Sequence, residues 1–274
     1  MERFDIDMTE PASLRDGDYQ VASKKSNEGG LWETIKVIVQ ALLIALVIRT
    51  VLFQPFNIPS GSLIPTLLIG DYLFVSKYSY GYSHFSLPSF LDLAPGMMPG
   101  RLFASQPKRG DIIVFKLPRD GETDYIKRLI GLPGDKVQVI KGRLYINGTI
   151  VERTPLPPYS MTDGGPANVA HYEETLPGGV KHEIIQLNGD DGEYDNTSVY
   201  TVPPGNYFMM GDNRDNSLDS RVPPEREGVG YVPFENLIGR AEVIFFSVEE
   251  GEPAWEVWRW PWTVRWNRLF RPVR

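Results

Sequence analysis

Cysteine is absent from this sequence, histidine is scarce, and positive charge is in short supply. The lack of cysteine excludes disulfide bonds, thiol nucleophiles and metal sites built on thiolates. The net charge of −7 makes nucleic acid an unsuitable partner for the chain as a whole. The three histidines, at positions 84, 171 and 182, lie in an aromatic loop or in a polar stretch, and none has the setting of a Ser-His-Asp triad.

The chain is instead rich in residues that interrupt and turn secondary structure. It holds 26 glycines and 23 prolines, which favours β architecture with many short connections over a helical bundle. A length of 274 residues is enough for one sizeable domain or two small ones, so a substantial hydrophobic core can form.

One long hydrophobic run, residues 31–53, stands near the N-terminus. Lys36 and Arg49 lie near its two ends, where their long side chains can extend to lipid headgroups. Pro55 follows as a helix stop. Because about 20 helical residues cross a bilayer, the run predicts a single transmembrane anchor.

Charges beside the anchor predict its orientation. Lys24 and Lys25 precede it, whereas no Lys or Arg occurs between Arg49 and Lys77. The positive-inside rule then puts the N-terminus in the cytoplasm and the larger C-terminal part outside. A cleaved signal peptide and a buried core helix are the alternatives. The long, acidic preceding segment argues against the first, and the flanking charges argue against the second.

Beyond the anchor the hydrophobic pattern changes to period two, which is typical of strands. Asn147-Gly148, between two apolar pairs, predicts a tight hairpin. The polar stretch 153–202 resembles an elaborated insertion outside the functional centre. Strands are predicted within residues 72–78, 111–117, 124–132, 135–140, 143–151, 207–212 and 230–248.

A serine just after the anchor is the first candidate for chemistry. Ser62 lies in the segment PSGSLIPTLLIGD, where Gly61 would allow unusual backbone angles and flanking prolines would stiffen the loop. A serine nucleophile needs a proton acceptor, and a lysine can serve if burial keeps it neutral. Lys127, in the apolar stretch DYIKRLIG, meets that condition. The alternative is a lysine that extends out of a half-buried strand.

A second polar segment, GDNRDNSLDSR at 211–221, follows an apolar strand. Its many turn-forming side chains favour a rigid, internally hydrogen-bonded loop, which could orient a neutral amine. A solvated surface loop is the alternative.

Four segments in this order, 59–71, 108–116, 124–137 and 211–221, resemble bacterial type I signal peptidases, the Ser/Lys membrane proteases that remove signal peptides. The resemblance implies that Ser62 is the nucleophile, Lys127 the general base and Ser60 an oxyanion donor. It implies a hydrogen bond from Ser217 to the Lys127 amine. Leu63 departs from the methionine usual in the family, which is a volume-conserving change. The other implied supporting residues are Asp212, Asp219, Arg128 and Arg221.

The same resemblance implies a substrate and a setting. Apolar walls would admit small side chains at the first and third positions before the cut, and the substrate would add as a strand beside residues 56–60 or 124–127. For Val114 and Leu67, ordinary core packing is the stronger alternative. The implied walls are Phe56, Ile58, Pro59, Leu67, Val114, Tyr125 and Ile126.

The implied enzyme uses no metal or cofactor. Its partners are secreted preproteins, the lipid bilayer and the protein-export machinery, and its catalytic part faces the periplasm from the cytoplasmic membrane. A related processing peptidase with one dedicated substrate, such as a pilin precursor, is an alternative. A non-catalytic, membrane-tethered β-domain is another.

The predicted fold class is mainly β: one N-terminal transmembrane helix, then an antiparallel catalytic sheet with an inserted β-rich subdomain. Two segments, 82–103 and the Trp/Arg-rich tail, suit either the membrane interface or packing on the core. The predicted division is a cytoplasmic tail 1–30, an anchor 31–53, a catalytic core 54–136 and 203–250, a subdomain 137–202 and a tail 251–274.

Overall fold

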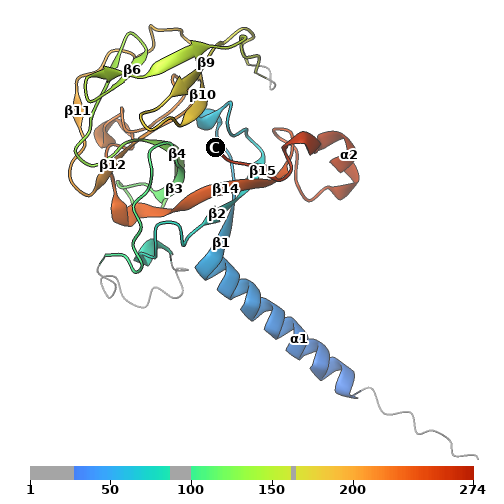
Figure 1. Ribbon diagram of the computed structural model, residues 1–274. Coiled ribbons are helices and arrows are strands. Elements are labelled where there is room, and N and C mark those ends of the chain that lie inside the picture. Colours follow the sequence, from blue (N-terminus) through green and yellow to red (C-terminus); the bar gives the residue numbers. More distant parts are fainter. Residues whose placement is uncertain (1–27, 87–99, 162–164) are drawn as a thin grey trace, which may run out of the picture. The chain divides into compact units, whose positions relative to one another are not determined.

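The structure is a computed structural model that describes residues 28–86, 100–161 and 165–274. These residues form antiparallel sheets and one long N-terminal helix (Figure 1). The predicted fold class is confirmed. Residues 1–27 of the predicted cytoplasmic tail and residues 87–99 of the aromatic segment lie outside the described residues.

The N-terminal helix α1 covers Glu28–Val47 and continues as a π-helical turn over Ile48–Leu52. Its apolar part, Gly30–Leu52, has 23 residues and a mean hydropathy of 2.3, and none of it is buried within the protein. This length is sufficient to cross a bilayer. The predicted anchor, residues 31–53, extends one residue beyond the observed helix, because Phe53 already belongs to strand β1.

Strand β1, Phe53–Asn57, contains Pro55, so this proline does not simply end the helix. Pro55 lies opposite Phe74 of β2. A proline is tolerated here because β1 is an edge strand, and an edge strand has one side that needs no hydrogen-bond donor. The chain therefore passes from helix to sheet without an intervening loop.

The main sheet has the order β1-β2-β14-β3-β4-β12-β13, with β15 added beside β14, and all its pairings are antiparallel. Its strands confirm five of the predicted segments. They are β2 (Asp71–Ser76), β3 (Ile112–Lys116), β4 (Asp124–Gly131), β12 (Asn206–Met210), β13 (Val232–Pro233), β14 (Leu237–Ser247) and β15 (Arg271–Pro272).

Two smaller sheets lie between β4 and β12 in the chain, with orders β10-β9-β8 and β11-β5-β6-β7. The predicted hairpin is confirmed: Asn147 and Gly148 both have positive φ, 54° and 79°, as a tight two-residue turn requires. The exact domain division stays a prediction. The strands are β5 (Lys136–Ile140), β6 (Arg143–Ile146), β7 (Thr149–Ile150), β8 (Glu152–Pro155), β9 (Ala170–Thr175), β10 (Lys181–Gln186) and β11 (Tyr200–Thr201).

Strand register sets where the two polar segments meet. On β4, Lys127 lies opposite Ile113 of β3, and Arg128 lies opposite Met210 at the end of β12. The loop 211–221 starts directly after Met210. It is therefore anchored beside the strand that carries Lys127.

The C-terminal tail packs on the body and exposes aromatic residues at the same time. Arg265 donates to the carbonyl of Ile69, and the buried Arg268 binds Asp71 through two nitrogens. Trp255 and Trp262 remain 77% and 76% exposed. The tail therefore packs on the core, as one of the two alternatives predicts, while contact with a membrane interface stays a prediction. It includes the short helix α2, Trp260–Thr263.

Candidate active site

Ser62 lies in a single 3₁₀ turn, Gly61–Leu63, that follows β1. It is 6% exposed. Gly61 does not use the unusual backbone angles that were expected, because its φ is not positive. A Cβ at Gly61 would lie 3.0 Å from the side chain of Ile64. The turn is thus packed tightly onto the residues that follow it.

Lys127 reaches this serine from the middle of β4. Its Nζ lies 2.7 Å from Ser62 Oγ and 3.1 Å from the carbonyl oxygen of Ile126, and the residue is 4% exposed. Burial lowers the pKa of the Lys127 amine from 10.5 to about 8, although the negative charges of Asp219 and Asp212 partly oppose this shift. An amine with this pKa is neutral in a useful fraction of molecules near neutral pH, so it can accept a proton.

A second buried lysine shows that burial alone does not identify a base. Burial lowers the pKa of Lys77 to about 8 as well. Its Nζ, however, donates to the carbonyl oxygen of Ser86 at 2.5 Å. A carbonyl has no proton to give, so the geometry singles out Lys127.

Beside Lys127, the buried Arg128 forms a two-point ion pair with Asp212. Nε and Nη2 of Arg128 lie 2.8 and 2.7 Å from the two carboxylate oxygens. Thr66 adds a hydrogen bond to the same carboxylate at 2.6 Å. Burial alone would raise the pKa of Asp212, but the Arg128 guanidinium lowers it overall. The pair ties β4, the loop 211–221 and the segment after Ser62 together.

Asp219 and Arg221 form a second buried pair within the loop. Nε and Nη2 of Arg221 each lie 2.9 Å from a carboxylate oxygen of Asp219. Asp219 also accepts from the backbone N–H of Gly211 at 3.0 Å. Burial works to raise the pKa of Asp219, and Arg221 lowers it overall. The predicted internally bonded loop is observed, and both carboxylates remain ionised near the amine.

The hydrogen bond expected between Ser217 and Lys127 is not formed. Ser217 Oγ is buried and has no hydrogen-bond partner among the described residues. The Lys127 amine is engaged by Ser62 and by the carbonyl of Ile126 instead. Gly211 makes room here, because a Cβ on it would come 2.3 Å from Ser217 Oγ and 2.5 Å from the carbonyl oxygen of Ser62.

Ser60 is exposed, and its Oγ lies 3.5 Å from Ser62 Oγ. Its hydroxyl is therefore adjacent to the nucleophile. It is free to turn toward a bound group, because its distance to Ser62 is at the limit of a hydrogen bond.

Five of the seven predicted wall residues share one apolar cluster beneath the turn. Ile58, Leu67 and Val114 are buried in it. Phe56 and Ile126 are partly buried against it. Tyr125 packs on a different cluster, although its ring centroid is 5.4 Å from Lys127 Nζ, and Pro59 is exposed.

Sequence reasoning missed the contribution of the insertion. The backbone N–H of Ile185, in β10, donates to the carbonyl of Asp212, and the N–H of Arg214 donates back to Ile185. Arg214 also pairs with the buried Glu174 of β9. The stretch 153–202 is therefore in direct contact with the loop beside the dyad. Only the long-range pairing of strand β10 with the loop 211–221 reveals this contact, and hydrophobic patterns carry no signal for it.

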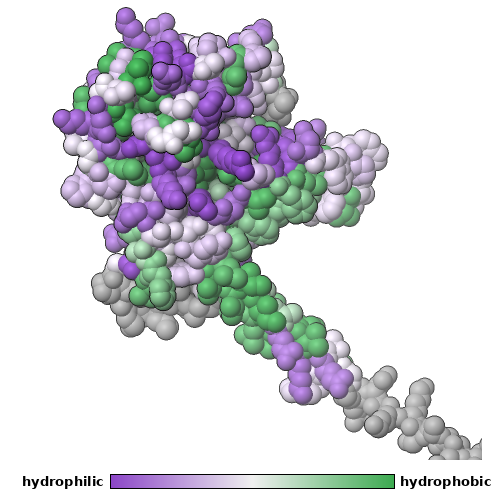
Figure 2. Space-filling model, in the orientation of Figure 1, coloured by the Kyte–Doolittle hydropathy of each residue, from purple (hydrophilic) through white to green (hydrophobic). Residues whose placement is uncertain are grey.

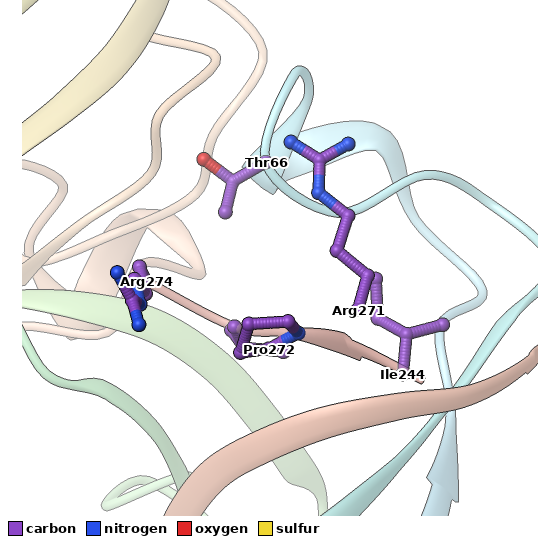
Figure 3. A pocket seen from close by; sticks show the side chains of 6 residues that line it. Thr66, Ile244, Arg271, Pro272 and Arg274 are labelled. Atoms are coloured by element: carbon purple, nitrogen blue, oxygen red, sulfur yellow. The ribbon is translucent and has the colours of Figure 1, made fainter. Parts of the chain in front are cut away.

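An open pocket of about 380 Å³ lies next to this site but not on the dyad (Figure 3). The C-terminal residues 271–274 form most of its wall, together with Ile244, which pairs with Arg271, and with Thr66 (Figure 3). The carbonyl oxygen of Arg274 accepts from Arg128 at 3.3 Å. The C-terminal residue thus adds a hydrogen bond to the buried ion pair of Arg128 with Asp212. Within residues 28–86, 100–161 and 165–274, no group of three His, Asp or Glu side chains could hold a metal ion.

Comparisons with known proteins show the family to which the chain belongs. A family model described as signal peptidase, peptidase S26, matches residues 31–246. Signal peptidase I of Rickettsia typhi is 48% identical over 213 residues, covering 76% of this chain and 77% of the relative. Signal peptidase I of Rickettsia canadensis is 43% identical over 257 residues, covering 88% and 91%.

Among solved structures, a signal peptidase I from Enterococcus faecalis V583 is 30% identical, covers 50% of this chain and 97% of its own chain, and has a TM-score of 0.28. The sequence matches extend over most of the chain and most of each relative. This chain therefore belongs to the signal peptidase, peptidase S26 family of signal-peptide-cleaving serine endopeptidases.

Proposed function

We propose that Ser62 and Lys127 are the nucleophile and general base with which this protein cleaves signal peptides from exported preproteins. The observation that carries the proposal is the 2.7 Å contact between Lys127 Nζ and Ser62 Oγ inside a buried site. The neutral amine takes the Ser62 proton while Oγ attacks the scissile carbonyl carbon. The amine then returns the proton to the leaving nitrogen. Water hydrolyses the resulting acyl-enzyme.

The developing oxyanion needs donors, and the 3₁₀ turn and the residue before it supply one each. They are the backbone N–H of Ser62 and the hydroxyl of Ser60, whose Oγ is 3.5 Å from Ser62 Oγ. Each well-aimed donor contributes about 3–4 kcal/mol to transition-state stability. The ion pairs of Arg128 with Asp212 and of Arg221 with Asp219 hold the surrounding loops in place.

A substrate in extended form can be held by backbone hydrogen bonds at two free strand edges. Strand β1 pairs only with β2, and β12 pairs with β4 only from Arg128 onward. Residues 56–60 and 124–127 therefore each present an edge that no strand of the described residues covers. The shared apolar cluster at Phe56, Ile58 and Ile126 then favours small, uncharged side chains at the first and third positions before the cut.

Cleavage of a purified preprotein is expected to leave a mature protein whose first residue follows a small-x-small sequence. The physical reason is that apolar walls beside the nucleophile turn favour small, uncharged side chains. N-terminal sequencing of the product checks the position. Replacing the small residue directly before the cut by a bulky one is the matched substrate control, and it should stop cleavage. Equal cleavage of both substrates would contradict the proposed pockets.

We also propose that the protein spans the cytoplasmic membrane once, with its N-terminus in the cytoplasm and residues beyond Phe53 in the periplasm. The export machinery would then deliver preproteins to the side that carries Ser62. The lysines before the anchor and their absence just after it support this orientation.

An aromatic surface on the β-rich body supports lipid contact. The rings of Phe74 and Phe245 stack at 4.2 Å, and Phe246 lies 5.0 Å from Trp260. Figure 2 shows hydrophobic residues along β14 where it approaches α2. The neighbouring tail adds the exposed Trp255 and Trp262 and several arginines, a combination suited to headgroups.

Tail tryptophans are expected to be quenched by brominated phospholipids when the protein is reconstituted in bilayers. The Trp32→Phe variant removes the one tryptophan of the anchor, so the remaining five report on the tail. Their ring faces lie within reach of bromine atoms only if the tail enters the interface. Tail fluorescence that is unaffected by bromolipid, and unshifted from that in detergent, would contradict lipid contact.

A further inference from the structure

One buried residue of the loop 211–221 holds the nucleophile turn directly, through its backbone and its side chain. The backbone N–H of Asn213 donates to the carbonyl oxygen of Ser62 at 3.1 Å. Its side-chain Nδ2 donates to the carbonyl oxygen of Gly61 at 3.2 Å. Asn213 is fully buried. Asn213 therefore donates hydrogen bonds to two successive carbonyls, those of Gly61 and Ser62, in a turn of three residues.

The bond to Gly61 has a geometric consequence for Ser62. The peptide between these residues is trans, since the cis peptide of the described chain lies at Ile64-Pro65. In a trans peptide the C=O of one residue and the N–H of the next point in opposite directions within a rigid plane. A Gly61 carbonyl held toward Asn213 thus directs the Ser62 N–H away from Asn213, on the other side of the turn.

Asn213 is itself held from the opposite side by β10. Its neighbours Asp212 and Arg214 exchange backbone hydrogen bonds with Ile185, at 3.0 Å each. Arg214 is further fixed by the buried carboxylate of Glu174. The residue therefore lies between a strand of the insertion and the nucleophile turn, with backbone bonds on both sides.

We infer that Asn213 is a positioning residue that aims the Ser62 N–H at the oxyanion. The inference rests on the proposed function, because it assigns the orientation of one of its two oxyanion donors. It also gives the insertion a role in catalysis, because strand β10 supports the loop that sets this orientation. Asn213 touches no reacting atom, so its effect passes through the peptide plane of Gly61 and Ser62.

Replacing Asn213 by alanine is expected to lower kcat by about tenfold to a hundredfold. Removal of an entire oxyanion donor typically lowers kcat by about 10²- to 10³-fold, and a misdirected donor retains part of its value. KM should change little, because the free strand edges and apolar walls do not involve this side chain. Asn213→Asp keeps the shape, removes the donor and adds a buried carboxylate, so it should lose at least a similar factor.

Asn236 offers a matched control. It is also buried, and its Nδ2 donates to a backbone carbonyl, that of Lys116, at 2.9 Å. Asn236→Ala removes an equivalent hydrogen bond away from Ser62 and should leave kcat near the wild-type value. Thermal melts of both alanine variants measure the loss of stability. If Asn213 had a purely structural role, this loss of stability would account for the whole loss of activity.

Substrate binding distinguishes a misdirected Ser62 N–H from a general disturbance of the site. In a Ser62→Ala background, adding Asn213→Ala should leave the dissociation constant of a preprotein peptide unchanged. Wild-type kcat in folded Asn213→Ala and Asn213→Asp would overturn the inference. Unfolding of both variants would also overturn it, and so would a rise in KM that accounts for the whole loss of kcat/KM. Such results leave the proposed function intact, whereas an active Ser62→Ala enzyme would remove the proposed function itself.

Discussion

Alanine at position 62 is expected to abolish preprotein cleavage, with kcat/KM reduced by about 10⁴-fold or more. The side chain of Ser62 is the group that forms the acyl-enzyme, and no other hydroxyl contacts Lys127 Nζ among the hydrogen bonds of the described residues. The fold should survive, because the substitution removes one oxygen from a turn that is held mainly by backbone contacts. Cleavage of a labelled preprotein, followed on gels, measures the loss.

Ser76→Ala is the matched control for this experiment. Ser76 is a buried serine of β2, and its hydroxyl lies 2.5 Å from the carboxylate of Glu242 and away from the dyad. This variant should keep wild-type activity even if it is slightly less stable. Substantial cleavage by folded Ser62→Ala protein would show that the nucleophile is another group.

Arginine at position 127 is expected to be as damaging as alanine at position 62. It keeps a positive charge, but a guanidinium is not deprotonated in proteins, so it cannot accept the Ser62 proton. The loss in kcat/KM should therefore again be about 10⁴-fold or more. Rates at several pH values check this, because a protonated lysine would regain activity at high pH and an arginine would not.

Lys77→Arg is the corresponding control, since Lys77 is buried and has a similarly lowered pKa, but its amine donates to a backbone carbonyl and not to a serine hydroxyl. It should retain activity in folded protein. Changing all three histidines to glutamine should also leave the chemistry intact. Wild-type turnover by Lys127→Arg would rule out the lysine as base.

Much of this site follows from local sequence. The strand around Lys127 could be predicted from its apolar, alternating pattern, but that pattern did not decide whether the amine is buried or extends out of the strand. The serine turn could be predicted because glycine and prolines flank Ser62. Their contact at 2.7 Å could not be derived from patterns, because the two residues are 65 positions apart. The family resemblance alone predicts that contact.

Other features depend on packing that hydrophobic patterns do not encode. Asn213 is one polar residue among many in its loop. Its hydrogen bond to the Gly61 carbonyl forms only when the turn and the loop are folded together. The role of Ile185 is carried by its backbone, which every residue possesses. Conversely, Ser217 occupies the expected loop without making the expected bond to Lys127, whose amine contacts Ser62 and the carbonyl of Ile126.

The pH dependence of kcat/KM tests the central claim, that the buried Lys127 amine is the base, most directly. The amine must be neutral to act, so activity should rise with pH along an ascending limb centred at about 8, and should fall about tenfold per pH unit well below that value. The same limb should persist in Lys77→Arg. A limb centred near the ordinary lysine pKa of 10.5, or one that disappears when Lys77 is replaced, would contradict the assignment of Lys127.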